Sequence, residues 1–261
     1  MRYHMRFVKM QGLGNDYVYV DAFTQTLPGD LPGLSRRVSA PHTGIGADGL
    51  IVISPSSAAD AEMRIFNADG SEAQICGNGL RCVARYLRDQ GFTPLNRVSI
   101  LTGAGLRTAD ILPDGQVECD MGQVRIIDPA PVTVQGIPLT RVDAGNPHAV
   151  LLDAWPADAD FYRLGPALEN DPFFPQRTNV EFVRVDSASE FTMRVWERGS
   201  GETMACGSGA CACFAAAMHM GRVGDRCTAH LAGGDLQLRL FGGRVYMTGP
   251  AVRVFEGIWP D

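Results

Sequence analysis

Two segments of this chain, residues 63–88 and 193–218, are copies of each other that align without gaps. Both open on Met-Arg and an apolar run, and both reach a cysteine at the same place, Cys76 in the first copy and Cys206 in the second. A duplicated chain folds into two similar halves related by a pseudo-two-fold axis. We therefore predict that the two cysteines face one another across a shared cleft.

Other parts of the halves correspond as well. Asn15 and Asn146 each follow a glycine ahead of the copied segment, and a glycine-containing hairpin turn follows each copy. Two units are too few for a solenoid. The pattern predicts two domains, 1–121 and 122–261, each of the usual size of a small domain. Residues 252–260 extend past the repeat, and we expect them to pair back onto the first domain.

Composition narrows the class of protein. With 261 residues, 45% of them hydrophobic and 20% charged, the chain is long enough to bury two cores. A net charge of −6 argues against nucleic acid or an anionic membrane as a partner, because either would call for a basic face. The first twelve residues carry charges where a signal peptide needs an apolar run, and no stretch is long and apolar enough to span a membrane. The cytoplasm is the expected compartment.

The seven cysteines are an odd number in a chain with no secretory signal, so reduced thiols are expected. A zinc site is not expected, because the spacing of Cys206, Cys211 and Cys213 lacks the C-x2-C pairs of structural zinc. Apart from the two duplicated cysteines, the remaining thiols are predicted to be small buried residues: Cys82, Cys119, Cys211, Cys213 and Cys227.

Short alternating runs and few long helices predict an antiparallel α+β fold rather than a Rossmann sheet. The helices are expected directly after the two duplicated cysteines. In the first, Leu80, Val83, Ala84 and Leu87 form one apolar stripe, whereas residues 210–218 are apolar all round and predict a buried helix. The predicted strands are 7–10, 17–20, 50–53, 63–67, 116–120, 180–185, 191–197, 236–240 and 244–247.

Each predicted helix is preceded by Cys-Gly-polar-Gly. A helix N-terminus binds a carboxylate through its N–H groups and favours thiolate over thiol. If two such termini converge on one carboxylate, Cys76 and Cys206 lie on opposite faces of its α-carbon, and one sulfur removes a proton while the other returns one. For each loop alone, a glycine-rich helix start with a buried thiol is the more common interpretation. The ungapped duplication favours racemisation chemistry.

The usual cofactor for amino-acid racemisation, pyridoxal phosphate, needs a lysine. The only lysine, Lys9, lies in a predicted N-terminal strand, away from any phosphate-binding loop. Residues 44–49 have only part of the dinucleotide-binding spacing, and a strand follows them where a helix would be needed. We therefore expect chemistry that uses no cofactor and no metal.

The chain resembles a known family, the diaminopimelate epimerases, nearly end to end. The motifs that carry the resemblance are 12–16 (GLGND), 42–49 (HTGIGADG), 66–71 (FNADGS), 76–82 (CGNGLRC), 145–148 (GNPH), 178–180 (TNV), 197–199 (ERG) and 205–210 (ACGSGA). The resemblance implies cofactor-independent interconversion of LL- and meso-2,6-diaminopimelate, on the route to lysine and cell-wall peptide. It also implies two pseudo-symmetric domains, each an antiparallel, barrel-like sheet around a central helix, and a homodimer.

The resemblance also assigns roles to residues. Cys76 and Cys206 become the acid/base pair, and His148 and Glu197 the residues that tune the thiols. The substrate-binding positions are Asn15, Asn67, Gly77, Asn78, Asn146, Asn179, Glu197, Arg198, Gly207 and Ser208. Without the resemblance, an asparagine beside glycine is an ordinary turn residue and an exposed Glu-Arg pair contributes little.

One position departs from the family pattern. Gly49 stands where many members have a glutamine that touches substrate. That contact is lost here or is supplied by backbone or water.

Two alternatives remain open on the sequence. A relative with the same two cysteines could act on another amino acid such as histidine. A protein of a different class would bind a carboxylate without catalysis, or would use facing thiols as a redox switch. Oxidation of a site with facing thiols would be expected to link Cys76 to Cys206.

Overall fold

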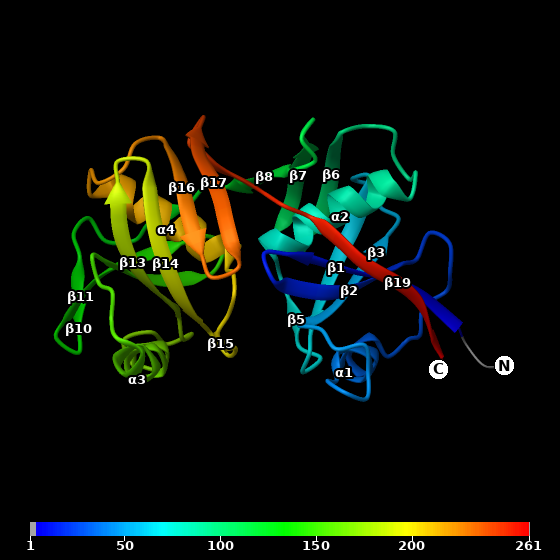
Figure 1. Ribbon diagram of the computed structural model, residues 1–261, viewed down its shortest axis with the longest axis horizontal. Coiled ribbons are helices and arrows are strands. Elements are labelled where there is room, and N and C mark those ends of the chain that lie inside the picture. The colour runs from blue at the N-terminus through cyan, green and yellow to red at the C-terminus, as the bar shows by residue number, and fades with distance from the viewer. Residues whose placement is uncertain (1–3, 261) are drawn as a thin grey trace. The chain divides into compact units, whose positions relative to one another are not determined.

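The computed structural model describes residues 4–260, which divide into two compact units (Figure 1). The boundaries fall between Cys119 and Asp120 and between Thr248 and Gly249. The first unit therefore contains both ends of the described chain.

The two units contain similar sets of elements. The first has helices α1 (Leu31–Ser39) and α2 (Gly77–Asp89) and strands β1 (His4–Gly12), β2 (Asn15–Asp21), β3 (Gly49–Ser54), β4 (Ala61–Asn67), β5 (Glu72–Ala73), β6 (Arg97–Thr102), β7 (Gly105–Ile111) and β19 (Val252–Pro260), with β8 (Val117–Gly122) crossing the boundary. The second has helices α3 (Asp158–Glu169) and α4 (Gly207–His219) and strands β9 (Arg125–Ile126), β10 (Val132–Val134), β11 (Ile137–Asp143), β12 (Pro147–Leu152), β13 (Asn179–Ser187), β14 (Glu190–Glu197), β15 (Gly201–Glu202), β16 (Arg226–Leu231), β17 (Gly234–Phe241) and β18 (Arg244–Gly249).

The order of these elements repeats. In each unit, after the opening strands, a strand, a helix and a parallel strand follow one another, as β2–α1–β3 and β12–α3–β13. A hairpin and the longer helix follow, and the chain returns parallel to an earlier strand, as β4–α2–β6 and β14–α4–β16. The predicted α+β class with an internal duplication is confirmed. The sheet is mixed rather than purely antiparallel, because each helical crossover brings the chain back in its original direction.

The strands predicted from the alternating patterns all form, with Gln116 lying one residue before β8. The turn between β17 and β18 shows why glycine was needed there. Gly242 and Gly243 have φ of 57° and 73°, and they connect the opposed pair Phe241 and Arg244. Two successive positive φ values make the two-residue turn that matches the twist of a hairpin.

The two longer helices are the cores of their units. The predicted stripe of α2, formed by Leu80, Val83, Ala84 and Leu87, is buried. Helix α4 is enclosed, since it contacts strands β9, β11, β12, β13, β14, β16 and β17. The five cysteines predicted to be small buried residues are all buried. No helix within residues 4–260 is long and apolar enough to span a membrane.

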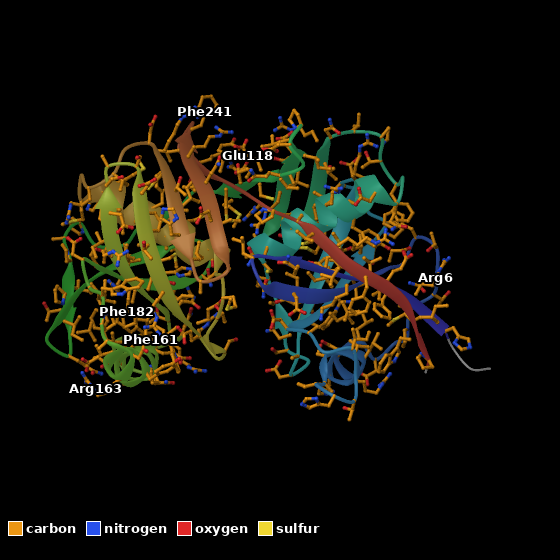
Figure 2. The ribbon with its side chains drawn as sticks, viewed as in Figure 1. Arg6, Glu118, Phe161, Arg163, Phe182 and Phe241 are labelled. Atoms are coloured by element: carbon orange, nitrogen blue, oxygen red, sulfur yellow. The ribbon has the colours of Figure 1, made fainter. Side chains whose placement is uncertain are left out.

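A second group of packed apolar side chains in the second unit lies between α3 and the sheet. Phe161 of α3 and Phe182 of β13 are fully buried, with ring centroids 5.3 Å apart. In Figure 2 both rings lie between helix and sheet, whereas Arg163 of α3 points outward. This packing fixes β13, the strand that carries several candidate site residues.

The C-terminal strand completes the first unit. β19 runs antiparallel to β1, with Trp259 opposite Met5 and Gly257 opposite Phe7. A Cβ at Gly257 would lie 2.8 Å from the Phe7 ring, so the close approach of the two strands requires glycine there.

Arg81 of α2 connects the returning C-terminal segment to the helix. It is fully buried, and it donates to the carbonyl of Pro250 at 3.0 Å and to Oδ1 of Asn78 at 2.8 Å. We expect Arg81→Met to lower the free energy of unfolding by about 2 to 5 kcal/mol, because two buried acceptors lose their donor. Urea unfolding measures this. The control, Arg85→Met, breaks only a partly exposed pair with Asp89 and should cost less than about 1 kcal/mol; equal losses would contradict the role given to Arg81.

Candidate active site

Cys76 is the N-cap residue of α2. Its backbone is extended, and its sulfur accepts from the N–H of Gly79 at 3.3 Å. The thiol donates to Oδ1 of Asn15 at 3.4 Å, and Asn78 donates to the same oxygen at 3.3 Å. The structure therefore brings Asn15, Cys76, Gly77 and Asn78 together at one helix start.

Asp48 holds Asn15 in place, a contact that the sequence analysis did not predict. Its Oδ2 accepts from Nδ2 of Asn15 at 2.7 Å and from the backbone N–H of Asp16 at 2.9 Å. Burial raises the pKa of Asp48, and the hydrogen bond from the Asp16 backbone opposes that shift. The carboxylate fixes the orientation of the Asn15 amide, so that Oδ1 is the atom presented to the thiol.

Asn67 ends β4, opposite Gly49 of β3. Its Nδ2 donates to Oγ of Ser71 at 3.0 Å. The structure also explains Gly49: a Cβ there would lie 2.1 Å from the carbonyl oxygen of Phe66 and 2.8 Å from the ring of Tyr17. This backbone therefore leaves no room for a side chain such as glutamine at that position.

Cys206 is the N-cap of α4, as Cys76 is of α2. Its sulfur accepts from the N–H of Gly209 at 3.4 Å and lies 3.6 Å from Oγ of Ser208. The thiol also interacts with the carboxylate of Glu197, whose Oε1 accepts from Thr203 at 2.5 Å. The two duplicated cysteines thus share backbone geometry but differ in their side-chain partners.

His148 lies between two acceptors in the second unit. Its Nδ1 is 2.6 Å from Oε1 of Glu181, and its Nε2 is 2.9 Å from Oδ1 of Asn146. The side chains of His148 and Glu181 are both completely buried. Glu181 is a site residue that the sequence analysis missed; the only signal was a carboxylate inside the apolar run 180–185.

The electrostatics of Cys206 set burial against the effect of the helix N-terminus. Burial raises the pKa of Cys206 well above its usual value, and the negative charges of Glu197 and Glu181 raise it further. The hydrogen bonds from Ser208 and Gly209 act in the opposite direction and are weaker. Burial also raises the pKa of Glu197. These shifts favour the thiol form of Cys206 over the thiolate.

This raised pKa predicts how Cys206 reacts with iodoacetamide. Because the thiolate is the nucleophile, its alkylation rate should keep rising with pH above about 8.5, the value at which an unperturbed cysteine is half ionised. Peptide mapping of the modified protein measures the rate, and the same cysteine in urea-unfolded chain is the control. A folded-state profile that levels off at or below the pH of the unfolded control would contradict the assignment.

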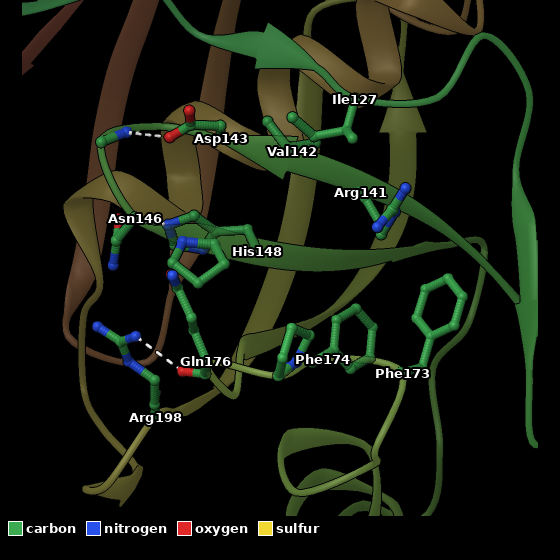
Figure 3. A pocket seen from close by; sticks show the side chains of 13 residues that line it. Ile127, Arg141, Val142, Asp143, Asn146, His148, Phe173, Phe174, Gln176 and Arg198 are labelled. Atoms are coloured by element: carbon green, nitrogen blue, oxygen red, sulfur yellow. Dashed lines mark hydrogen bonds between the residues drawn. The ribbon is translucent and has the colours of Figure 1, made fainter.

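Arg198 and Asn179 form the outer part of the site. Oδ1 of Asn179 accepts from the backbone N–H of Arg198 at 3.0 Å, and its Nδ2 donates to the carbonyl of Pro147 at 2.9 Å. The exposed Arg198 guanidinium donates to the carbonyl of Gln176 at 3.0 Å, the contact drawn in Figure 3.

A pocket of about 450 Å³ opens beside these residues. Figure 3 shows Asn146, His148 and Arg198 at one end of it and Phe173, Phe174 and Arg141 at the other. It therefore offers a cation and amide groups at one end, and two aromatic rings beside a second arginine at the other.

The predicted site residues thus form two groups, one in each unit. Asn15, Cys76, Gly77 and Asn78 gather in the first, while Asn67 lies at the end of β4 with Ser71 as its partner. The second group contains Asn146, His148, Asn179, Glu197, Arg198, Cys206, Gly207 and Ser208.

Comparison with solved structures defines the fold class. A PhzF-family phenazine biosynthesis protein from Bacillus anthracis covers 98% of this chain and 99% of its own, with a TM-score of 0.76 and 14% identity. A hydroxyproline epimerase from Agrobacterium vitis, solved with trans-4-hydroxy-L-proline, gives a TM-score of 0.72 at 19% identity over 98% and 91% of the two chains. The fold of this chain is thus shared with these two proteins.

Sequence comparison defines the family. Residues 7–127 and 140–254 match the family model of diaminopimelate epimerase. Diaminopimelate epimerases from Desulfitobacterium hafniense and Moorella thermoacetica are each 46% identical to this chain, over 97% and 98% of it and over 98% and 99% of their own lengths. The chain belongs to the diaminopimelate epimerase family.

Proposed function

We propose that this protein interconverts LL- and meso-2,6-diaminopimelate, with Cys76 and Cys206 as the acid/base pair. The observation that supports this most is the matched position of the two thiols. Each is the N-cap residue of a 13-residue helix in a duplicated unit, with the same extended backbone and the same contact to the second glycine of Cys-Gly-x-Gly.

The helix starts would bind the reacting carboxylate. The first N–H groups of an α-helix have no partner within the helix, and the helix dipole places positive potential there. The backbone at Gly77, Asn78, Gly207 and Ser208 is assigned this role. A carboxylate held by these groups brings its α-carbon close to both sulfurs, as removal and return of a proton on opposite faces require.

The two thiols would begin the reaction in different protonation states. Cys206 is the protonated member because of its burial and its two neighbouring carboxylates. For the direction in which Cys206 donates, Cys76 acts as the thiolate that removes the α-proton. One turnover inverts the α-carbon and leaves Cys76 as the thiol and Cys206 as the thiolate. The reverse reaction starts from these states, with the roles of the two residues exchanged.

The outer polar residues would bind the distal amino-acid group of diaminopimelate. Together, Arg198, Asn67 and Asn179 offer more polar contacts than the binding of a simple amino acid needs. A guanidinium grips a carboxylate with two charge-assisted hydrogen bonds. Arg198 is exposed beside the pocket and donates to the backbone carbonyl of Gln176, a contact that it can exchange for such a ligand.

The proposed chemistry uses no pyridoxal phosphate. Lys9, the only lysine of the chain, lies buried in β1. Its ammonium pairs with Asp16 and donates to the carbonyl of Gly46. A lysine held this way is poorly placed to form a Schiff base.

We further propose that the protein is a cytoplasmic homodimer. The exposed apolar side chains of β19 support self-association: Val252, Val254, Phe255 and Ile258. Exposed apolar side chains of this kind are a surface that a second copy would cover. Sedimentation equilibrium determines the oligomeric state.

The substrate assignment is tested by proton exchange in deuterated water with LL-diaminopimelate, lysine and histidine side by side. We expect deuterium at the α-carbon of diaminopimelate without added cofactor, and very slow exchange with the other two. Exchange of lysine or histidine at the same rate would point to a different two-cysteine racemase. No exchange with any amino acid would favour the carboxylate-binding or redox-switch alternative.

A further inference from the structure

Glu181 is a buried carboxylate for which the proposed reaction has no direct use. Its side chain is completely buried in β13, and Oε1 lies 2.6 Å from Nδ1 of His148. The other oxygen, Oε2, is also buried and has no hydrogen-bond partner among the described residues. Burying a carboxylate with an unsatisfied oxygen costs stability, so its presence calls for a reason other than packing.

The first unit shows that the fold does not need a carboxylate here. In the parallel pair β2–β3, Tyr19 lies opposite Ile51, and in the matching pair β12–β13, Val150 lies opposite Glu181. The two side chains lie under the same turn of their helices. A Cβ at Gly79 would lie 2.7 Å from Cδ1 of Ile51, and one at Gly209 would lie 2.9 Å from Oε1 of Glu181.

The partner of Glu181 is likewise particular to the second unit. His148 pairs with Asn179, and the matching residue in the first unit, Tyr17, pairs with Gly49. The His–Glu pair has thus replaced a Tyr–Ile pair at equivalent positions of the duplicated fold. The two halves have the same backbone arrangement here, but only the second carries a buried carboxylate.

We propose that Glu181 is a positioning residue for the reaction proposed above: its carboxylate holds the proton of His148 on Nδ1, fixes the ring orientation, and makes the Cys206 half-site chemically unlike the Cys76 half-site. A carboxylate on Nδ1–H is a well-attested way to fix the tautomer and orientation of a catalytic imidazole. Glu181 itself need not touch substrate. The inference rests on the proposed function.

Several ionisable groups face this pair from the neighbouring elements. They are Asp143 of β11, Glu197 of β14, and Cys206 and Cys213 of α4. The charge of Glu181 contributes to the raised pKa of both thiols. Removing that charge should therefore ease ionisation of Cys206 and move the alkaline limb of the kcat profile to lower pH.

Two variants test the proposal. Glu181→Ile installs the residue that the first unit has at the same place, and Glu181→Gln keeps the shape without the charge. We expect kcat to fall on the order of 10²- to 10⁴-fold in Glu181→Ile, the range typical when the carboxylate partner of a catalytic imidazole is replaced. KM should stay within about threefold, because no substrate contact is lost. Glu190→Gln, at an exposed carboxylate that starts β14, is the matched control and should behave as the unmodified protein.

Nitrogen-15 NMR of the imidazole rings provides a readout independent of activity. The chain has only five histidines, so the His148 ring can be assigned by its loss in His148→Gln. The unmodified protein should show a proton on Nδ1, where Glu181 accepts it, and Glu181→Ile should lose that proton, because Nε2 keeps its own acceptor in Asn146. The ring measurement remains decisive for the Glu181–His148 contact even if diaminopimelate proves not to be the substrate. Unchanged kcat and pH profile in both variants would overturn the proposal, as would an unchanged His148 tautomer.

Discussion

Replacing either Cys76 or Cys206 with serine should reduce diaminopimelate epimerisation roughly 10²- to 10⁴-fold, the contribution usual for a positioned acid or base. A serine hydroxyl has a far higher pKa than a thiol and is a poor proton acceptor near neutral pH. Both sulfurs are N-caps, and a serine oxygen caps a helix at least as well. The loss should therefore be chemical, with folding retained, and substrate binding measured by calorimetry should largely persist.

Cys227→Ser is the control for these two variants. Cys227 lies in β16, where its sulfur donates to the backbone carbonyl of Thr228, a contact that a hydroxyl reproduces. This variant should keep full turnover. Near-normal activity in Cys76→Ser or Cys206→Ser would contradict the two-thiol mechanism, and added pyridoxal phosphate should restore neither.

Arg198→Ala should weaken transition-state binding by about 2 to 4 kcal/mol, the usual scale for truncating one partner of a close charge pair. The reason is the distal carboxylate of diaminopimelate, which would lose its bidentate donor. The ratio kcat/KM for LL-diaminopimelate measures the effect. Arg198→Lys keeps the charge without the planar fork and should recover only part of the loss.

A matched control for Arg198 is Arg163→Ala. Arg163 is an exposed arginine on α3 whose partner is Asp160 of the same helix. Its side chain points outward in Figure 2, and its replacement by alanine should leave kcat/KM unchanged. If Arg198→Ala were silent as well, the proposed recognition of the distal carboxylate would be wrong, although the two-cysteine chemistry could still hold.

The duplication and the helix starts were predictable because both are local patterns. The apolar stripe of α2 and the all-apolar run of α4 appear directly in residue order, and the N-cap cysteines follow from the glycines beside them. The parallel strand pairs were not predictable from alternation alone, because alternation is the same in parallel and antiparallel strands and says nothing of how the chain returns.

The parts of the site that sequence missed depend on contacts between distant strands. Glu181 appeared as a single carboxylate in an apolar strand, and only the parallel pairing of β12 with β13 brings His148 to it. The sequence left the protonation state of Cys206 open for the same reason. The helix start is visible in the sequence and favours thiolate, whereas the burial and the carboxylates that outweigh it come from the folded structure.

Gly49 illustrates the opposite case, in which the structure explains a departure seen in the sequence. The backbone oxygen of Phe66 occupies the space that a Cβ would need. We therefore infer that the local backbone requires glycine at position 49, so that its presence is more than the simple loss of a substrate contact.

The most direct test of the central claim is the isotope content of substrate and product early in one turnover experiment. LL-diaminopimelate in deuterated water is stopped before equilibrium, and both epimers are separated and examined by mass spectrometry. Two thiols on opposite faces predict that the meso product carries one solvent deuterium while the recovered LL substrate carries almost none, because the abstracted proton returns only to its own face. Product that retains the substrate's proton would show that a single base serves both faces, and would contradict the assignment of Cys76 and Cys206 as a pair.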